Sequence, residues 1–355
     1  MTGQPAVASA RAGTSLAQSA PMGGTFDLQR RLAGLLRRTA RWPRQAGRAC
    51  RATLSGVLTV CATAAIAQPS APAESHALLM WVSDYGHREA NLPGVAHDAD
   101  RAQQIAALIG VPRRNVRTLS EAAVTQLGIE AALRQLLQRI RPGDRVFIYF
   151  SGHGKQVDGA RFGAVCSEGL VTQDGALYLD IAIQYSVQQL AEKAGQVVMM
   201  NDSCHAGGAA TKRFIPDVGA DDEVPKSYPF EVSKVVGQTA TAKDGQRCGQ
   251  PVNKSFDPAA AMARGALPQR WLYLAAARAD EVAFASGTGS RATRAWLRCL
   301  AEPGLRADAD GDGQVSGEEL LACAQPLVDR MGRERQHLAV EGNARMAILR
   351  LSARR

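Results

Sequence analysis

Two short apolar runs constrain the fold of this chain more than any other feature. Residues 146–150 and 197–200 are unbroken apolar stretches, which is typical of strands buried on both faces of a parallel sheet. A polar motif follows each run, Ser-Gly-His-Gly after the first and Asn-Asp-Ser-Cys-His after the second. Ligands of open α/β sheets bind at the carboxyl ends of the strands. The sequence therefore predicts His153 and Cys204 at one sheet edge, where a thiol and an imidazole can carry out acyl transfer.

The remaining elements alternate between strand and helix patterns. This alternation predicts right-handed crossovers and a mostly parallel sheet. A glycine-containing hairpin region is expected between the His153 strand and about Leu179. The other expected strands are 77–82, 116–119, 271–276 and 346–351, and the expected helices are 98–109, 125–140, 181–194, 291–300 and 318–331.

The basic charge of the chain is concentrated in its first 67 residues. They contain nine arginines, no lysine and one acid, Asp27, which gives +8 of the formal net charge of +9 and leaves +1 for residues 68–355. A nucleic-acid-binding domain would carry its basic patch on the folded part. We therefore expect no nucleic-acid partner.

The same segment has the pattern of a secretory signal. Arginines up to Arg51 precede an apolar run at 54–66, and Ala65-Ile66-Ala67 supplies small residues for cleavage before Gln68. The run is too short for a comfortable membrane span. We expect cleavage after Ala67 and a periplasmic or secreted protein with no stable membrane span, although an uncleaved anchor is the alternative. Residues 68–75 are expected to be a linker to a domain at 76–352.

Five cysteines would remain after that cleavage. If Cys204 stays a thiol, the other four can form two disulfides in an oxidising compartment, or remain free and buried. Cys299 and Cys323 flank one loop and are a plausible pair. Cys166 would then pair with Cys248 by elimination.

At these residues the chain resembles the caspase-like cysteine peptidases, and among them metacaspases and their bacterial relatives. The resemblance rests on the two motifs and on their separation of about fifty residues. Further matches are residues 77–85, Pro93-Gly94 leading to His97-Asp98-Ala99, and residues 275–281. It implies an α/β caspase-hemoglobinase sandwich, with a mostly parallel six-stranded sheet and helices on both faces. It also implies a protein or peptide substrate and no organic cofactor.

The catalytic roles follow from the chemistry. Cys204 must react as the thiolate, and His153 would take its proton and pass it to the leaving amine. By resemblance, the backbone N–H groups of Gly154 and Cys204 would stabilise the oxyanion. His205 is a competing base, although a residue adjacent to Cys204 is expected to point elsewhere.

The resemblance also predicts the substrate side chain. Asp98, Ser151 and Asp202 occupy positions that line an acidic pocket in metacaspases, and carboxylates bind Arg or Lys through charge-assisted hydrogen bonds. We therefore expect cleavage after Arg or Lys. The alternatives are that Asp98 caps its helix and that Asp202 orients its loop.

Residues 308–319 match the twelve-residue calcium loop of EF-hands. Pro303-Gly304 breaks the helix that should enter this loop, so the alternative is an acidic turn that caps the following helix. We expect a structural Ca²⁺ site. Its ligands would be Asp308, Asp310, Asp312, Gln314 through its carbonyl, Ser316 and Glu319. Glu168 and Asp174 could belong to a separate activating site, but no carboxylate lies at 207–211 to complete it.

Residues 211–264 are expected to form a long surface loop rich in lysine and arginine, Lys226 among them. If the pocket accepts basic residues, this loop is a candidate for self-cleavage; a solvated linker is the alternative. For the whole chain, the alternative to a peptidase is a catalytically silent domain that binds a peptide or protein, because an oxidising compartment threatens a free thiol. A module built around the calcium loop alone is a third, weaker hypothesis.

Overall fold

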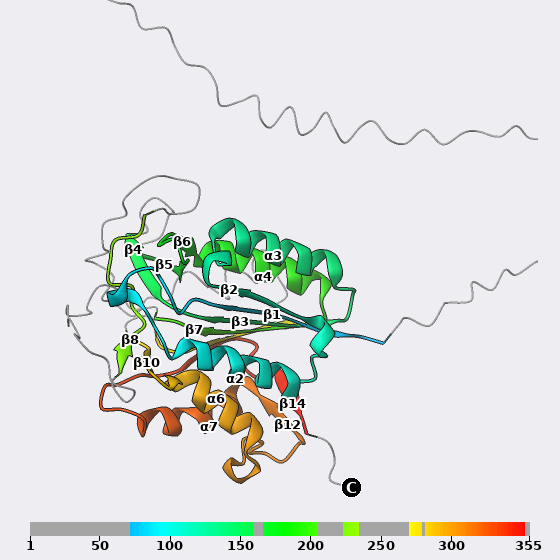
Figure 1. Ribbon diagram of the computed structural model, residues 1–355. Coiled ribbons are helices and arrows are strands. Elements are labelled where there is room, and N and C mark those ends of the chain that lie inside the picture. Colours follow the sequence, from blue (N-terminus) through cyan, green and yellow to red (C-terminus); the bar gives the residue numbers. More distant parts are fainter. Residues whose placement is uncertain (1–71, 159–165, 205–222, 234–269, 279–280, 352–355) are drawn as a thin grey trace, which may run out of the picture. The chain divides into compact units, whose positions relative to one another are not determined.

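The computed structural model describes residues 72–158, 166–204, 223–233, 270–278 and 281–351 (Figure 1). The chain divides into two units, Met1–Gln68 and Pro69–Arg355, and every element described below belongs to the second. The expected signal segment lies outside the described residues. Among the helices of the described part, none is long and apolar enough to cross a membrane.

A six-stranded sheet forms the centre of the domain, in the order β13-β9-β7-β3-β1-β2. All neighbouring strands are parallel except β13, which runs antiparallel to β9. The expected mostly parallel six-stranded sheet is therefore confirmed. Its strands are β1 (Ser75–Trp81), β2 (Val116–Ser120), β3 (Arg145–Ser151), β7 (Gln196–Asp202), β9 (Trp271–Ala275) and β13 (Ala339–Gly342).

Helices cover both faces of this sheet, as Figure 1 shows, with α3 and α4 on one face and α2, α6 and α7 on the other. Successive residues of β3 alternate between two cores: Ile148 and Phe150 face one, and Phe147 and Tyr149 face the other. This two-sided burial is why the strand is an unbroken apolar run. The helices are α2 (Val95–Leu108), α3 (Gln126–Arg139), α4 (Asp180–Lys193), α6 (Arg291–Ala301) and α7 (Gly317–Asp329).

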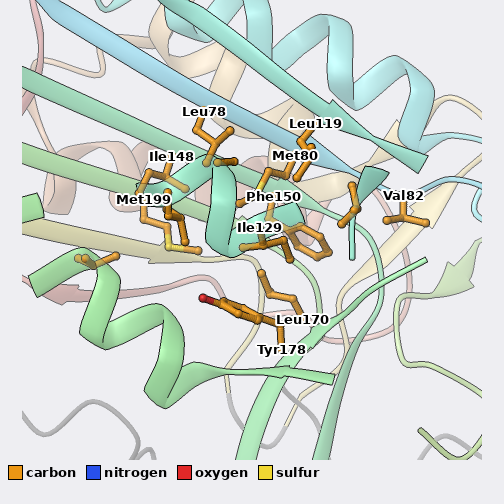
Figure 2. Close-up of a cluster of buried hydrophobic side chains, with 14 of the residues drawn as sticks. Leu78, Met80, Val82, Leu119, Ile129, Ile148, Phe150, Leu170, Tyr178 and Met199 are labelled. Atoms are coloured by element: carbon orange, nitrogen blue, oxygen red, sulfur yellow. The ribbon is translucent and has the colours of Figure 1, made fainter. Parts of the chain in front are cut away.

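The core between the sheet and α3 explains the apolar spacing that predicts this helix (Figure 2). Thr125 caps α3 by accepting a hydrogen bond from the Gly128 N–H, and the helix buries Ile129, Leu133 and Leu136 on one face. Burial of each such side chain contributes about 1.5–3 kcal/mol. Figure 2 shows Ile129 among side chains of β1, β3 and β7, so the amphipathic stripe fixes α3 on this face of the sheet.

Smaller sheets surround the carboxyl edge and the end of the domain. The expected hairpin region is a three-stranded antiparallel sheet of β4 (Gly154–Asp158), β5 (Cys166–Val171) and β6 (Leu177–Leu179). A second sheet contains β8 (Val224–Pro225), β10 (Phe284–Ser286) and β11 (Gly289–Ser290), and a third pairs β12 (Gln314–Ser316) with β14 (Ala347–Arg350). Short 3-10 turns are Arg88–Ala90, Arg113–Asn115, Glu121–Ala123 and Pro303–Leu305.

Two sequence expectations differ from this topology. The strand expected at 346–351 is β14, which pairs with β12 rather than joining the central sheet. The sixth central strand is β13, which the sequence analysis missed because all four of its residues are only half buried at the sheet edge. Part of the loop expected at 211–264 is also not on the surface, since β8 lies within it and the next residue, Lys226, is fully buried.

The expected disulfide between Cys299 and Cys323 is confirmed. It joins α6 to α7, with a Cα–Cα distance of 6.1 Å. Cys204 is a free, buried thiol. Cys248 and the side chain of Cys166 lie outside the described residues, so their pairing stays a prediction.

Candidate active site

The register between β3 and β7 brings the two polar motifs together. Ser151 lies opposite Asp202 at the carboxyl ends of the two parallel strands, and the candidate catalytic residues His153 and Cys204 each follow two residues later. Beyond the strands the two loops are in contact. A Cβ atom on Gly154 would lie 1.8 Å from the Cys204 carbonyl oxygen, so only glycine allows this approach.

The His153 ring is held by a backbone carbonyl and by aromatic neighbours. Its Nε2 lies 2.8 Å from the carbonyl oxygen of Ala90. A carbonyl can only accept, so Nε2 carries the proton and Nδ1 offers a lone pair. Nδ1 is buried and makes no hydrogen bond within the described residues. The Tyr85 hydroxyl accepts from the His153 N–H at 2.7 Å, and the rings of Tyr85 and Tyr228 pack at centroid distances of 4.8 and 5.6 Å.

The Cys204 thiol is completely buried beside the strand β10. Its Sγ accepts a hydrogen bond from the Ala283 N–H at 3.1 Å and lies 3.4 Å from the Ala283 carbonyl oxygen. Burial raises the pKa of Cys204 to about 12, although the Ala283 N–H and the charge of Lys226 act in the opposite direction.

Burial has the mirror effect on the imidazole. It lowers the pKa of His153 to about 4, against the smaller raising effect of the Ala90 and Lys226 carbonyls. At neutral pH the two groups are therefore a thiol and a neutral imidazole. A Cys204 thiolate and a His153 imidazolium would need more contact with water than this site gives them, because burial penalises both charged forms.

The three residues predicted to line an acidic pocket do lie together, and we call Asp98, Ser151 and Asp202 the acidic pocket. All three are fully buried. The Ser151 hydroxyl lies 3.3 Å from Asp98 Oδ2. Ser290 joins the two carboxylates: its N–H donates to Asp98 at 3.0 Å and its hydroxyl donates to Asp202. Thr293 also donates to Asp202, at 2.5 Å.

A lysine of the same chain fills this pocket. Lys226 Nζ lies 2.9 Å from Asp202 Oδ1 and donates to Ser151 Oγ at 2.8 Å, and the residue has no exposed surface. Arg101 Nη1 lies 3.2 Å from Asp98 Oδ1. Burial and the nearby charge of Asp202 nevertheless raise the pKa of Asp98 to about 6. The two carboxylates of the pocket are thus paired with two cations, and burial is the main reason for the raised pKa of Asp98.

This geometry bears on the alternatives for the two aspartates. Asp98 does not cap its helix, because α2 begins at Val95 with Gly94 as its N-cap. Asp98 points instead to Ser290, which is 192 residues away in sequence. Asp202 both pairs with Lys226 and accepts from hydroxyls of α6 and its cap, so an orienting role is compatible with a binding role.

The predicted oxyanion donor already has a partner. The Gly154 N–H donates to the carbonyl oxygen of Lys226 at 3.0 Å. A peptide carbonyl of the same chain thus accepts from this N–H, and the oxyanion role of Gly154 and Cys204 stays a prediction. His205 lies outside the described residues.

Several residues of the site escaped the sequence analysis. Tyr85, Ala90 and Ala283 act through one ring or one backbone group, and Ser290 and Thr293 belong to α6 and its cap. No local pattern marks them, because each contact joins residues far apart in sequence. Only Lys226 carried a signal, as a basic residue of the expected processing loop.

The expected calcium loop brings three carboxylates together. Oxygen atoms of Asp308, Asp310 and Asp312 lie within 4.8 Å of one another, the only such group of three potential ligands among the described residues. Glu319 accepts from the Ala309 N–H at 2.9 Å and forms a capping box with Ser316 at the start of α7. Ser316 and Glu319, which cap α7, are therefore also two of the predicted Ca²⁺ ligands. Outside this loop, Glu168 accepts from Gln156 and Asp174 from Thr172.

Comparisons with known proteins agree with this fold. The family described as caspase domain matches residues 74–335, which is more than half of the chain. The chain belongs to the caspase domain family. A crystal structure of a protein from Geobacter sulfurreducens superposes with a TM-score of 0.51 at 17% identity, covering 79% of this chain and all of that one. Caspase-1 from Spodoptera frugiperda aligns at 11% identity with a TM-score of 0.47, covering 79% and 92%. No curated protein matches the sequence.

Proposed function

We propose that this caspase-domain protein is a cysteine endopeptidase that cuts after Lys or Arg, with Cys204 as nucleophile and His153 as base. The observation that carries this proposal is a lysine side chain bound between Asp202 and Ser151, beside the strand ends that carry the thiol and the imidazole. The alternative is a catalytically silent caspase-like domain that binds a peptide or protein partner. The complete burial of Cys204 is the observation that favours it.

The chemistry proceeds in two stages. His153 Nδ1 takes the thiol proton, Sγ attacks the substrate carbonyl, and the same proton passes to the leaving amine. Water then hydrolyses the thioester. The Ala90 carbonyl orients the imidazole, and the N–H groups of Gly154 and Cys204 stabilise the oxyanion.

Specificity follows from the charges in the acidic pocket. Arg101 already pairs with Asp98, and a substrate lysine or arginine would bring the cation that pairs with Asp202, whereas a substrate aspartate would add a third negative charge. We therefore expect fluorogenic peptides ending in Arg or Lys to be cleaved and those ending in Asp to be refused.

The test compares the wild type with Cys204→Ala and Asp202→Asn on such peptides. We expect Cys204→Ala to lose activity and Asp202→Asn to lose about 2–5 kcal/mol of binding to the basic side chain, seen mainly in kcat/KM. Asp100→Asn, an exposed change on α2, is the matched control. Preference for Asp, or undiminished turnover by Cys204→Ala, would refute the assignment. Labelling of Cys204 by an electrophilic peptide mimic ending in Arg separates the enzyme from the silent binder.

We also propose that residues 308–319 bind Ca²⁺. The clustered oxygens of Asp308, Asp310 and Asp312 support this, since Ca²⁺ prefers several oxygen ligands. The Gln314 carbonyl, Ser316 and Glu319 would complete the set, and the ion would clip the turn before α7 to that helix. Isothermal titration should detect uptake by wild type and by Asp100→Ala, and none by Asp308→Ala. Equal uptake by all three would exclude this site.

We finally propose that the protein is periplasmic or secreted, on the basis of the arginine-rich and apolar leader. Expressed with its leader in a bacterium, the chain should reach the periplasm or the medium with a new N-terminus at Gln68. A cytoplasmic product that retains the leader would contradict this.

A further inference from the structure

We propose that the domain has a second ligand site, which binds a phosphate group between α3 and the strands β1 and β2 at one edge of the central sheet. The site is a cavity of about 110 Å³ lined by side chains of these elements and by Asn115, just before β2. It lies at the amino end of the sheet, because His76 in its wall pairs with Val146 at the start of β3. The candidate active site follows the carboxyl ends of the strands, so binding here would be separate from the proposed peptidase activity.

The cavity has a buried apolar part and an exposed polar part. Leu78 of β1 and Leu136 of α3 are buried, and both belong to the core between the sheet and this helix. On the polar side, Arg117 is half buried, whereas Gln135 and Arg139 are exposed. A single water needs about 10–15 Å³ of such space, so the cavity has room for several waters or for one tetrahedral oxyanion. A larger substituent on that oxyanion can leave on the exposed side.

Two arginines in the cavity wall, Arg117 and Arg139, form no ion pair with any of the described residues. Arg117 Nη1 donates to Gln135 Oε1. Arg139 Nη2 donates to Asn115 Oδ1 at 3.0 Å and to the Arg114 carbonyl at 3.2 Å. A guanidinium has five N–H donors in a planar fork that matches the oxygens of a phosphate group. Each arginine therefore keeps donors for a ligand.

The two carboxylates near the cavity are already engaged elsewhere. Glu74 accepts a hydrogen bond from Asn115 Nδ2 at 2.7 Å and lies 3.7 Å from Arg114 Nη2. Asp144 accepts from the N–H groups of Glu74 and Arg141, each at 2.8 Å. Neither carboxylate pairs with the two arginines of the cavity wall, so an anion from outside the chain can take that position.

The buried histidine of the cavity adds an acceptor to these donors. His76 Nε2 lies 3.1 Å from Asp144 Oδ2. Although burial acts to raise it, hydrogen bonds from two N–H groups and from His76 hold the pKa of Asp144 below its ordinary value. Asp144 is thus a carboxylate that can only accept, so Nε2 carries the proton and Nδ1 of the neutral ring has a lone pair.

This lone pair indicates which anion fits. His76 is 4% exposed, and its Nδ1 is buried without a hydrogen-bond partner among the described residues. A buried acceptor without a donor is unfavourable, so a ligand that brings a proton is preferred. Hydrogen phosphate and singly charged phosphate monoesters have oxygens for the arginines and one P–OH group for the imidazole. Sulfate and phosphate diesters have the oxygens but not the proton.

The experiment is isothermal titration of the purified full chain at pH 7.5 in a buffer free of phosphate and calcium. Inorganic phosphate and glycerol 3-phosphate are the two probes, and each should bind once per chain. The tighter of the two shows whether the free ion or an ester is the better ligand. Sulfate and dimethyl phosphate should bind at least ~tenfold more weakly, because a site built around a hydrogen bond rejects the analogue that lacks it.

Substitutions in the cavity wall test the assignment of residues. Arg117→Gln and Arg139→Gln should each weaken phosphate binding by ~10–100-fold, because each removes charge-assisted hydrogen bonds. Arg134→Gln is the matched control, since Arg134 is also an exposed arginine of α3 but does not line the cavity. His76→Phe should bring the affinity for phosphate close to that for sulfate.

Urea unfolding with and without phosphate gives a second readout on the same proteins. A ligand that binds only the native state stabilises it, so phosphate should raise the unfolding midpoint of wild type and of Arg134→Gln. It should raise the midpoint much less in the two variants of the cavity arginines. The curves without phosphate show whether each variant is folded, and the arginine variants test the site even if His76→Phe is not.

The outcomes are distinct from those of the peptidase assays. If neither phosphate binds, or if both bind wild type and the Arg117 and Arg139 variants equally, the site is overturned. If sulfate binds as tightly as phosphate at pH 7.5, the selection by His76 is overturned. Turnover of basic peptides should be the same in Arg117→Gln and Arg139→Gln as in wild type, because the two sites lie at opposite ends of the strands.

Discussion

At the residue scale, the unusual feature is a cluster of charges with almost no contact with water. Asp98, Asp202 and Lys226 are fully buried, and the cation is shared between the pocket residues. Such clusters are expensive to desolvate, so they seldom add stability. Removing one charge of this cluster would leave its partner buried and unpaired, which is strongly destabilising.

Two buried groups should give opposing pH effects on stability. The pKa of Asp98 is raised from 3.8 to about 6, so the native state binds this proton more tightly and stability falls as pH rises through that interval. The pKa of His153 is lowered from 6.5 to about 4, so its contribution to stability rises over pH 4 to 6.5. In the wild type the two slopes offset each other.

Single substitutions should separate them. In Asp98→Asn the free energy of unfolding should rise with pH more steeply than in wild type, and in His153→Gln it should fall with pH. Each change in slope is at most about 1.4 kcal/mol per pH unit, the value for one proton. Urea unfolding between pH 4 and 6.5 measures both. Superimposable profiles for wild type and Asp98→Asn would show that this carboxyl keeps an ordinary pKa.

At the scale of elements, the start of α2 is fixed by a close backbone approach. Gly94 caps this helix, and a Cβ there would lie 1.8 Å from the Ser286 carbonyl oxygen of β10 and 2.7 Å from the Gly289 nitrogen. This contact holds α2, which carries Asp98, against the strand that pairs with β8. The glycine is therefore needed for the geometry of the pocket rather than for backbone freedom.

Gly94→Ala should accordingly destabilise the protein by about 1–3 kcal/mol and weaken turnover of basic peptides, because either α2 or β10 must shift. Gly304→Ala is the control, since a Cβ at that position meets no atom within 4 Å. Urea unfolding and peptide assays measure the two effects. Comparable losses in both variants would indicate that the close approach is unimportant.

At the scale of the whole domain, the disulfide between Cys299 and Cys323 ties α6 to α7 across 24 residues of sequence. Both helices cover the same face of the sheet, and α6 also contributes Thr293 to the pocket. In a chain-entropy treatment, a loop of this length stabilises the folded state by about 3–4 kcal/mol.

The double variant Cys299→Ser, Cys323→Ser should therefore lose about 3–4 kcal/mol of the free energy of unfolding. Comparison of urea curves for the oxidised wild type and the double variant checks this. Adding reductant should lower the wild type toward the variant. A variant as stable as oxidised wild type would mean that the helix packing alone holds α6 and α7.

The sequence alone was enough to predict the central parallel sheet with its helices and the place of His153 and Cys204 after two strand ends, and it made Cys299 and Cys323 a plausible pair. These follow from local patterns: a run buried on both faces, a helical stripe, a cap or a short spacing. The sequence also indicated three residues of an acidic pocket, but only through a resemblance.

The residue that occupies that pocket and the contacts that hold it together became visible only in the folded chain. Lys226 is 75 residues from Ser151, and Ser290 is 192 from Asp98, so their contacts leave no periodicity in the chain. The edge strand β13 escaped for the opposite reason, because a half-buried strand needs little apolar character. Short-range residue patterns determine which helices and strands form. Charge pairs between distant residues and the pairing of the edge strand depend instead on which segments the fold brings together.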